Sequence, residues 1–229
     1  MRIISFSGGV ESTSLLQFYE DGDLVVTYKE DGYRRESSYR NLENINSIAR
    51  YYGIKIYYYD VKIANPFFQW HSMEDPGVDY PPHQKHWIFP ALYSLAMRLG
   101  KHRCKGILYG DNWDDINFTM GKLSKKATEH WEKAWPVLSP DIPMIRPLLD
   151  KSKKDCWDAI PNKVKPYVKW CPTTPDKPCN QCKKCDEFNY LVLGKRDRRT
   201  RDWAKSSGAF NYYEKSLANV GRPANKSSD

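Results

Sequence analysis

The hydrophobic positions along the chain alternate between short apolar runs and segments of helical periodicity. Residues 3–6, 24–28 and 54–61 are apolar runs rich in β-branched and aromatic side chains, and each predicts a strand. Between the second and third runs, apolar positions recur at helical spacing over residues 42–52, and Gly53 ends the predicted helix. This alternation predicts an α/β protein with a mainly parallel sheet.

Further elements continue the alternation towards the carboxyl end. Residues 81–99 predict a helix opened by a Pro-Pro pair, whereas residues 62–80 are polar, aromatic and non-periodic and predict a long loop near the site. Residues 106–109 predict a fourth strand, and residues 144–145 a short fifth one. Residues 152–155 have the pattern of a capping box at a helix start. The order fits a doubly wound sheet, in which ligands bind at the carboxyl ends of the strands.

The segment directly after the first strand is the clearest functional motif: Ser7-Gly8-Gly9-Val10-Glu11-Ser12-Thr13. It predicts a two-glycine turn and the opening of a helix, where free N–H groups make a ready anion site. No lysine follows the glycines, so the spacing is not that of a Walker A loop. An ordinary strand–turn–helix corner is the alternative, but the position at the end of the first strand favours nucleotide binding.

Other polar residues are expected at the same edge of the sheet, because parallel strands end there. Gly110 and Asp111 follow the fourth strand, and Asp111 is the stronger candidate to hold Mg²⁺, which takes oxygen ligands, against phosphates. Asp114 and Asp115 either join that site or cap the next helix. Tyr28 closes the second strand, where an adenine ring could lie against it.

Composition and charge narrow the class of protein. Hydrophobic residues make up 40% of the 229-residue chain and charged residues 28%, which is typical of a soluble globular protein with one sizeable core. No apolar run approaches membrane-spanning length, and the run at the amino end meets Ser7 at once, which predicts no signal peptide and a cytoplasmic location. The net charge of +8 favours polyanionic partners, and ATP and RNA both meet that description.

Four cysteines with short spacings gather near the carboxyl end: Cys171, Cys179, Cys182 and Cys185. Four thiolates in a tight, proline-rich segment suit a closed tetrahedral Zn²⁺ site, which leaves no open position for catalysis. Two disulfides or an iron–sulfur cluster are the alternatives, and disulfides are disfavoured in a reducing compartment. Cys104 and Cys156 stand apart, and both are expected to pack in the core.

Taken together, the glycine-containing loop and the cysteine motif resemble those of the QueC family, the 7-cyano-7-deazaguanine (preQ0) synthases. The loop is similar to the Ser-Gly-Gly-x-Asp-Ser pyrophosphate loop of the PP-loop ATP pyrophosphatases, to which that family belongs. Residues 80–86, 106–111 and 147–153 also resemble family segments, and the resemblance covers about residues 1–190. It implies an adenine nucleotide alpha hydrolase-like, Rossmann-like fold with a small C-terminal zinc-binding lobe.

The resemblance implies an ATP-dependent C–N ligase that adenylates the carboxylate of 7-carboxy-7-deazaguanine. Ammonia then gives the amide, a second ATP would dehydrate it to the nitrile, and AMP and pyrophosphate are released. Adenylation is needed because a carboxylate lacks a good leaving group, so the protein must orient the α-phosphate and stabilise the departing pyrophosphate. Lys153 matches the family's lysine and, with Asp111, is the expected catalytic pair; a solvated helix residue is the alternative for Lys153.

The resemblance and the fold pattern together give the expected ligand-binding residues. ATP is expected to contact Ser7, Gly8, Gly9, Glu11, Ser12, Thr13, Tyr28 and Gly110. The substrate is expected to contact His83 and Lys85, for which surface exposure is an equal alternative.

The sequence also departs from the family pattern. Glu11 replaces the family's Asp, which moves the carboxylate one methylene further out. Residues 66–71 are heavily aromatic and match no family segment, and residues 83–85 differ from the expected Arg-Asn pair. These differences indicate a divergent member that stops at the amide or uses another carboxylate; a composition rich in Lys, Tyr and Asn would suit a phage homologue.

The pattern predicts three regions: an ATP-binding PP-loop domain over residues 1–160, a zinc-binding segment over 161–194 and a basic, partly disordered extension over 195–229. Basic residues near aromatics can bind nucleic acid, but the charge run at 195–201 is more typical of a solvated face. The expected partners are therefore a deazaguanine substrate and ammonia, with no membrane; a homodimer is compatible with the sequence. The rival hypotheses are a tRNA-modifying PP-loop enzyme and an inert nucleotide-binding module.

Overall fold

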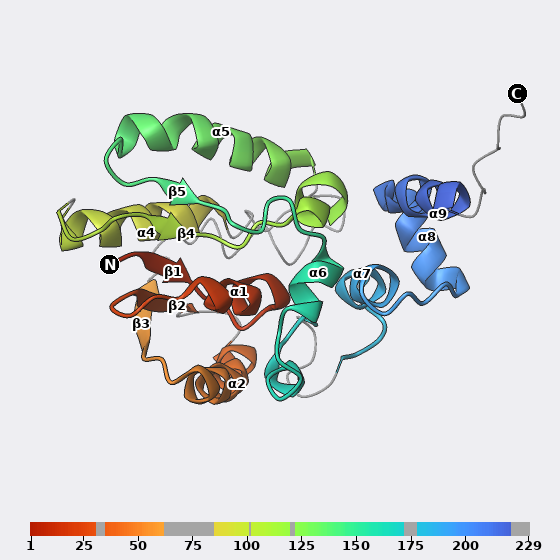
Figure 1. Cartoon of the computed structure of the whole chain (residues 1–229), viewed down its shortest axis with the longest axis horizontal. Helices are drawn as coiled ribbons and strands as arrows, with labels where there is room; N and C mark the ends of the chain where they lie inside the picture. Colours follow the sequence, from red (N-terminus) through yellow and green to blue (C-terminus); the bar gives the residue numbers. More distant parts are fainter. Residues whose placement is uncertain (31–34, 62–84, 101, 120–121, 172–177, 221–229) are drawn as a thin grey trace, which may run out of the picture.

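The structure, a computed structural model, describes residues 1–30, 35–61, 85–100, 102–119, 122–171 and 178–220 (Figure 1). Within these residues one sheet contains the strands β1 Ile3–Ser5, β2 Leu24–Glu30, β3 Ile56–Val61, β4 Ile107–Leu108 and β5 Met144–Ile145. Their order is β3-β2-β1-β4-β5, and every neighbouring pair is parallel. The order turns at β1, which is the switch point where a doubly wound sheet binds its ligand. The predicted α/β class and all five predicted strands are confirmed.

The helices are α1 Val10–Ser14, α2 Arg35–Tyr52, α4 Lys85–Leu99, α5 Lys122–Leu138, α6 Lys153–Asp158, α7 Lys183–Leu191, α8 Arg198–Ser207 and α9 Ala209–Val220. Shorter helical turns are η1 Leu15–Phe18, η2 Asp115–Thr119 and η3 Lys165–Tyr167. The sequence predicts α2 from its apolar stripe but places its start later, whereas α5 and α7–α9 were not predicted. The expected loop over 62–80 and the opening Pro-Pro pair lie outside the described residues.

The strands bury both faces of the sheet, because successive side chains point to opposite sides. Ile4 and Val25 join a core that α1 and α2 complete. Their neighbours Ile3 and Val26 join a second core under α4 and α5. Figure 1 shows these two helix layers on either side of the sheet. The expected burial of Cys104 and Cys156 is confirmed, one in each core.

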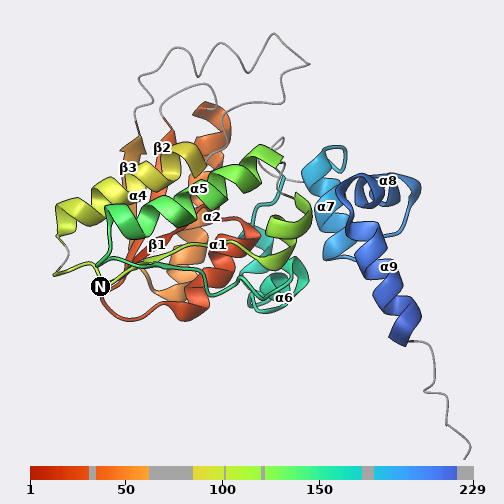
Figure 2. The ribbon, with the colours of Figure 1, turned by 90° about the horizontal axis from the view of Figure 1, so that it is seen from above.

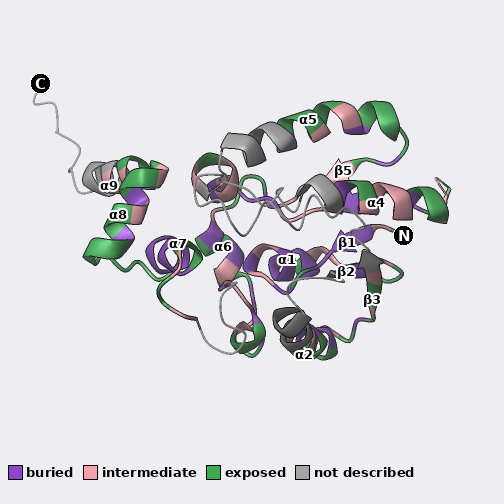
Figure 3. Ribbon diagram, turned by 180° about the vertical axis from the view of Figure 1, so that it is seen from behind, coloured by how far each residue is buried: buried purple, intermediate pink, exposed green. Residues whose placement is uncertain are grey.

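The last three helices form a group beside α6 (Figures 1 and 2). Helix α7 is mostly buried, whereas α8 exposes one side (Figure 3). Arg199 pairs with Asp186 of α7, and Arg196 pairs with Glu214 of α9 at 3.1 Å. Part of the basic extension therefore packs onto the protein as helix. In the described part of the chain, no helix has both the length and the apolar character needed to cross a membrane.

Candidate functional site

The loop between β1 and α1 is held in shape by its own hydroxyls and backbone. Gly8 has φ of +74°, a left-handed conformation that favours glycine. The Ser7 backbone N–H donates to Ser12 Oγ at 3.1 Å, and Ser12 Oγ lies 3.3 Å from the Gly9 carbonyl oxygen. Helix α1 starts after Gly9 and continues directly into the turn η1. Internal hydrogen bonds thus hold the loop in this shape.

The predicted ATP-binding residues of this loop differ in their access to solvent. Ser7 is exposed, and Gly9 and Glu11 are half-buried. Ser12 is buried, with its hydroxyl engaged inside the loop. Thr13 is fully buried, and its Oγ1 has no hydrogen-bond partner among the described residues. The structure therefore places Thr13 in the interior and Ser7 at the surface, whereas Gly9 and Glu11 lie between the two.

Gly110, in the loop after β4, lies directly against the start of α1. A Cβ at this position would stand 3.2–3.3 Å from backbone and Cβ atoms of Glu11 and from the Ser12 nitrogen. Such a contact is tighter than ordinary packing, so the close approach of the two loops requires glycine here. The sequence expected Gly110 near ATP; the structure shows that it sets the distance between the two loops.

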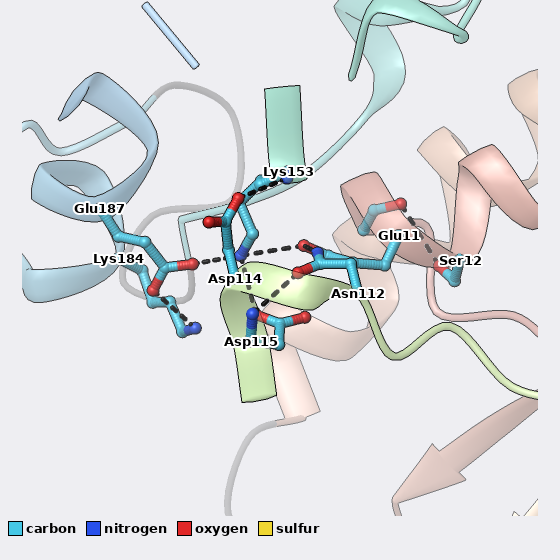
Figure 4. A network of polar contacts seen from close by, with 9 residues as sticks. Glu11, Ser12, Asn112, Asp114, Asp115, Lys153, Lys184 and Glu187 are labelled. Atoms are coloured by element: carbon cyan, nitrogen blue, oxygen red, sulfur yellow. Dashed lines mark hydrogen bonds and ion pairs between the residues drawn. The ribbon is translucent and has the colours of Figure 1, made fainter. Parts of the chain in front are cut away.

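Lys153 is the centre of a buried polar network (Figure 4). Its ammonium contacts Glu11 Oε1 at 2.9 Å, Asp115 Oδ1 at 3.1 Å and the Glu187 carboxylate. Only 7% of the Lys153 side chain is exposed, so the alternative of a solvated helix residue is wrong. Ser152 and Asp155 form the predicted capping box, which starts α6 at Lys153 and directs that residue at the network.

The charges of the network depend on one another. Burial alone would lower the pKa of Lys153, but Asp115, Glu11 and Glu187 together raise it well above its ordinary value. Burial raises the pKa of Glu11, and the Lys153 ammonium opposes that rise. One protonated lysine therefore stands among three carboxylates.

The loop after β4 joins this network through side chains that the sequence left open. Asp114 accepts the Lys153 backbone N–H through Oδ2 and the Tyr213 hydroxyl through Oδ1, each at 2.6 Å. Burial raises the pKa of Asp114. Asn112 donates to Glu11 Oε1 at 3.3 Å and accepts from the Asp115 N–H at 2.8 Å. Asp114 thus satisfies a backbone donor at the start of α6.

The remaining predicted site residues are Asp111, Tyr28, His83 and Lys85. Asp111 is buried, and its Oδ2 lies 3.9 Å from Arg146 Nη1 in an ion pair. Tyr28 is inside β2, opposite Tyr59 of β3. The side chains of Tyr28 and Lys85 are not described, although Lys85 starts α4, and His83 lies outside the described residues.

A small cavity of about 120 Å³ separates the loop from α7. Its polar lining is Glu11, Lys153, Lys169, Lys184 and Glu187, and its apolar lining is Val10, Trp170 and Phe188. The rings of Trp170 and Phe188 stack at 4.0 Å with an interplanar angle of 11°.

Sequence reasoning missed three of the five polar lining residues: Lys169, Lys184 and Glu187. The sequence signal that could have identified these three residues is their position beside the cysteine motif. Lys169 stands two residues before Cys171, and the other two lie within the first turns of α7.

The four cysteines of the motif converge into one cluster, with all their sulfurs within 4.8 Å of one another. The Sγ atoms of Cys171 and Cys182, and those of Cys179 and Cys185, are 3.9 Å apart. All are free thiols. A single ion bound to four sulfurs at about 2.3 Å would separate them by about 3.8 Å, so the cluster fits one tetrahedral metal ion.

Backbone groups support this cluster. The Cys179 N–H donates to Cys171 Sγ and the Gln181 N–H donates to Cys179 Sγ, each at 3.4 Å. The Gln181 N–H lowers the pKa of Cys179, which favours the thiolate that a metal needs. Asn180, which lies between Cys179 and Gln181, has a φ of +53° and makes the turn there.

No protein-family model matches the chain, and no curated protein matches it. Among solved structures, the chain is similar to the U34-tRNA thiolase NcsA from Methanococcus maripaludis, solved with its 4Fe-4S cluster. The identity is 13% and the TM-score 0.47, with 99% of this chain and 75% of the thiolase chain covered. The class of protein is fixed by the strands themselves: a doubly wound parallel α/β protein with a C-terminal cysteine cluster that can bind a metal.

Proposed function

We propose that the chain is an ATP-dependent ligase of the PP-loop type, which transfers AMP to the carboxylate of a small substrate. The observation that carries this proposal is the convergence of Lys153 and Glu11 at the glycine-containing loop. The Lys153 ammonium lies 2.9 Å from Glu11 Oε1, at the switch point of a parallel sheet. A protonated lysine held beside an open loop of backbone N–H groups suits a polyphosphate.

The chain's own residues would then have separate roles. The backbone of Gly8 and Gly9 would hold the terminal phosphates, and Lys153 would stabilise the charge that develops on departing pyrophosphate. Lys169 and Lys184 line the adjoining cavity and would add positive charge. Mg²⁺, bound with ATP, would offset the remaining phosphate charge through oxygen ligands. Glu11 would orient Lys153.

The state of the thiols favours amidation over sulfur transfer. A sulfur relay needs a reactive thiolate near the nucleotide. Cys156 is the cysteine whose pKa responds to Glu11 and Asp115, but burial, with those two carboxylates, raises its pKa to about 12. Burial also raises the pKa of Cys104. The surroundings of both thiols outside the cluster therefore disfavour the thiolate.

We assign zinc to the cysteine cluster. Bound to four thiolates, zinc supplies a structural cross-link and no open coordination position. In a four-iron cluster each cysteine would bind a different iron, which needs more widely spaced sulfurs than the 4.8 Å limit here. Metal analysis of the purified protein should give one zinc per chain; stoichiometric iron and acid-labile sulfide would overturn the assignment.

The proposed substrate is 7-carboxy-7-deazaguanine, with ammonia as the nitrogen donor. The experiment incubates the protein with Mg-ATP, ammonium and this carboxylate, followed by mass spectrometry for AMP, the amide and the nitrile. Lys153→Ala should abolish AMP release, whereas Lys154→Ala, which alters the neighbouring half-exposed lysine, should retain it. AMP formation with no amide or nitrile would reject this carboxylate and keep the adenylation step.

A second candidate is an ATP-dependent enzyme that acts on tRNA, and the surface of α8 favours it. Arg198 is 97% exposed, and Arg201 and Lys205 are also exposed on this helix. Exposed cations on one helix suit phosphate contacts whose strength falls with salt. A salt-sensitive tRNA complex would support this candidate, and no complex at low salt would remove it.

Glu11 tests the third hypothesis, an inert nucleotide-binding module. If the wild type binds ATP without releasing AMP and Glu11→Asp restores AMP release, the natural loop is degenerate. We expect the opposite, because Glu11 already reaches Lys153 at 2.9 Å and a shorter side chain would lose that contact.

A further inference from the structure

The cysteine cluster is fastened to the nucleotide loop on its amino side. Two residues before Cys171, the backbone N–H of Lys169 donates to the Gly8 carbonyl oxygen at 2.9 Å. The Lys169 carbonyl oxygen also lies 3.5 Å from the position that a Cβ on Gly9 would occupy. The segment that leads into the cluster therefore lies directly against the glycine-containing loop.

A second connection lies on the carboxyl side. Glu187 follows Cys185 by two residues and is 3% exposed. Its carboxylate contacts the Lys153 ammonium through one oxygen and Lys184 Nζ through the other, the latter at 2.9 Å. Figure 4 shows Glu187 reaching from α7 towards Lys153, opposite Glu11.

Helix α7 links the sulfurs to this carboxylate. It starts after Cys182, and the Cys185 N–H donates to the Cys182 carbonyl oxygen at 2.9 Å. At 3.6 residues per turn, Cys185 and Glu187 are separated by about 200° around the helix. The sulfur and the carboxylate therefore point to nearly opposite sides, so any rotation of the helix start moves both.

We propose that Glu187 is a positioning residue that makes Lys153 depend on the metal in the cysteine cluster. With metal bound, Cys182 and Cys185 fix the start of α7 and hold Glu187 against Lys153. Without metal, the helix start can rotate, and Lys153 keeps Glu11 and Asp115 as its acidic partners. This inference rests on the proposed function, because it makes the metal a regulator of the lysine that would contact phosphate.

The first test measures Lys153 directly and needs no nucleotide. The folded full chain, loaded with one equivalent of zinc or treated with a chelator, is labelled briefly with an amine-acetylating reagent and analysed by peptide mass spectrometry. Lys154, the half-exposed neighbour, is the internal standard. We expect the Lys153 labelling rate to rise about tenfold on zinc removal, and to rise similarly in zinc-loaded Glu187→Gln. Zinc removal from Glu187→Gln should add less than about twofold.

The matched control is Asp186→Asn. Asp186 is the adjacent buried carboxylate of α7, but it pairs with Arg199 of α8. This variant should label Lys153 at the wild-type rate and keep the response to zinc. If Glu187→Gln does not fold, Glu187→Asp replaces it, with an intermediate labelling rate expected because its charge is kept and its reach shortened.

The second test is ATP binding by titration calorimetry on the same three proteins, with and without zinc. We expect zinc removal to weaken wild-type binding about tenfold and Glu187→Gln binding by less than about twofold. Equal, additive losses, unchanged Lys153 labelling after chelation or failure of the cluster to bind zinc would overturn the inference. If the labelling pattern holds but the wild type neither binds ATP nor releases AMP, the proposed function fails and the coupling stands.

Discussion

The glycine-containing loop and the cysteine segment both come from short sequence motifs, but the fold supports them differently. Around the loop, Phe6, Val10 and Leu15 are buried in a core that also holds the central strands. The cysteine cluster places four sulfur atoms within 4.8 Å of one another. The loop is therefore shaped by packing and internal hydrogen bonds, whereas the cysteine segment brings together four sulfurs that can hold a metal.

The two regions meet at Lys153. Its carboxylate partner Glu11 belongs to the loop, and Glu187 belongs to α7, the helix that also carries Cys185. A buried ion pair gives little net stability, but removing one partner leaves an uncompensated charge. The buried lysine therefore makes the glycine-containing loop and the cysteine segment, which come from distant parts of the sequence, depend on each other.

The largest expected effect is that of Lys153→Met. This change leaves three acidic side chains, between 5% and 21% exposed, without their cation. We expect the free energy of unfolding to fall by about 3–5 kcal/mol. Denaturant unfolding measures it, with Lys154→Met as the control, for which a change within about 0.5 kcal/mol is expected. Equal losses in both variants would show that the network does not require the lysine.

Next comes Cys182→Ser, which removes one of the four sulfurs. A metal present at a hundred times its dissociation constant stabilises a fold by about 2.7 kcal/mol, and we expect a loss of that order. Zinc content should fall to near zero, and amides of the 178–185 segment should exchange faster than those of β1. Cys104→Ala, in the second core, should keep its zinc. Unchanged zinc content and melting in Cys182→Ser would show that the cluster is not a metal site.

A matched glycine pair separates loop shape from ligand access. Gly8→Ala forces a left-handed residue at φ of +74° and should cost about 1–2 kcal/mol of stability. Gly9 has φ of −77°, and its added Cβ would meet neighbours at 3.5 Å, which is ordinary contact. Gly9→Ala should therefore fold normally but weaken ATP binding about tenfold, because its methyl group occupies the phosphate's approach. Thermal melting measures the stability of each variant, and titration calorimetry measures its ATP affinity. Parallel losses of stability and ATP binding in Gly9→Ala would contradict a role of Gly9 in ATP binding.

The smallest effect concerns the capping box of α6. The Ser152 hydroxyl lies 2.7 Å from Asp155 Oδ2 and lowers the pKa of Asp155. Because this pKa is depressed in the folded state, the stabilisation is present above the unfolded value near 3.9 and is lost as pH falls through the folded value. Ser152→Ala should cost about 1 kcal/mol at pH 7, as expected for an N-cap. The difference from the wild type should shrink in acid but not vanish, because Ser152 Oγ also accepts from the Asp155 backbone N–H. A difference that stays constant with pH would exclude the contribution of the Asp155 carboxylate.

Local patterns predicted the elements whose cause is local. The β-branched runs gave the strands, and the sequence from Ser152 to Asp155 gave the start of α6. The pattern also predicted that Gly110 lies at the same edge of the sheet as the glycine-containing loop. It did not reveal α7 or α8, because α7 buries polar side chains such as Asp186 and Glu187 alongside its apolar ones. Helix α8 buries only Thr200 and Ala204, so neither helix has a broad apolar stripe.

The candidate site also has features with a local cause and features that depend on tertiary packing. The sequence alone determined which residues are available: a glycine-containing loop, a capped lysine and four closely spaced cysteines. Tertiary structure decided that Glu11, Asp115 and Glu187 surround Lys153, that Asp111 instead pairs with Arg146, and that the loop touches Lys169. The physical reason is distance along the chain: backbone preferences act over a few residues, whereas a contact such as Asn112 with Glu11, 101 residues apart, exists only once the sheet has brought its strand ends together.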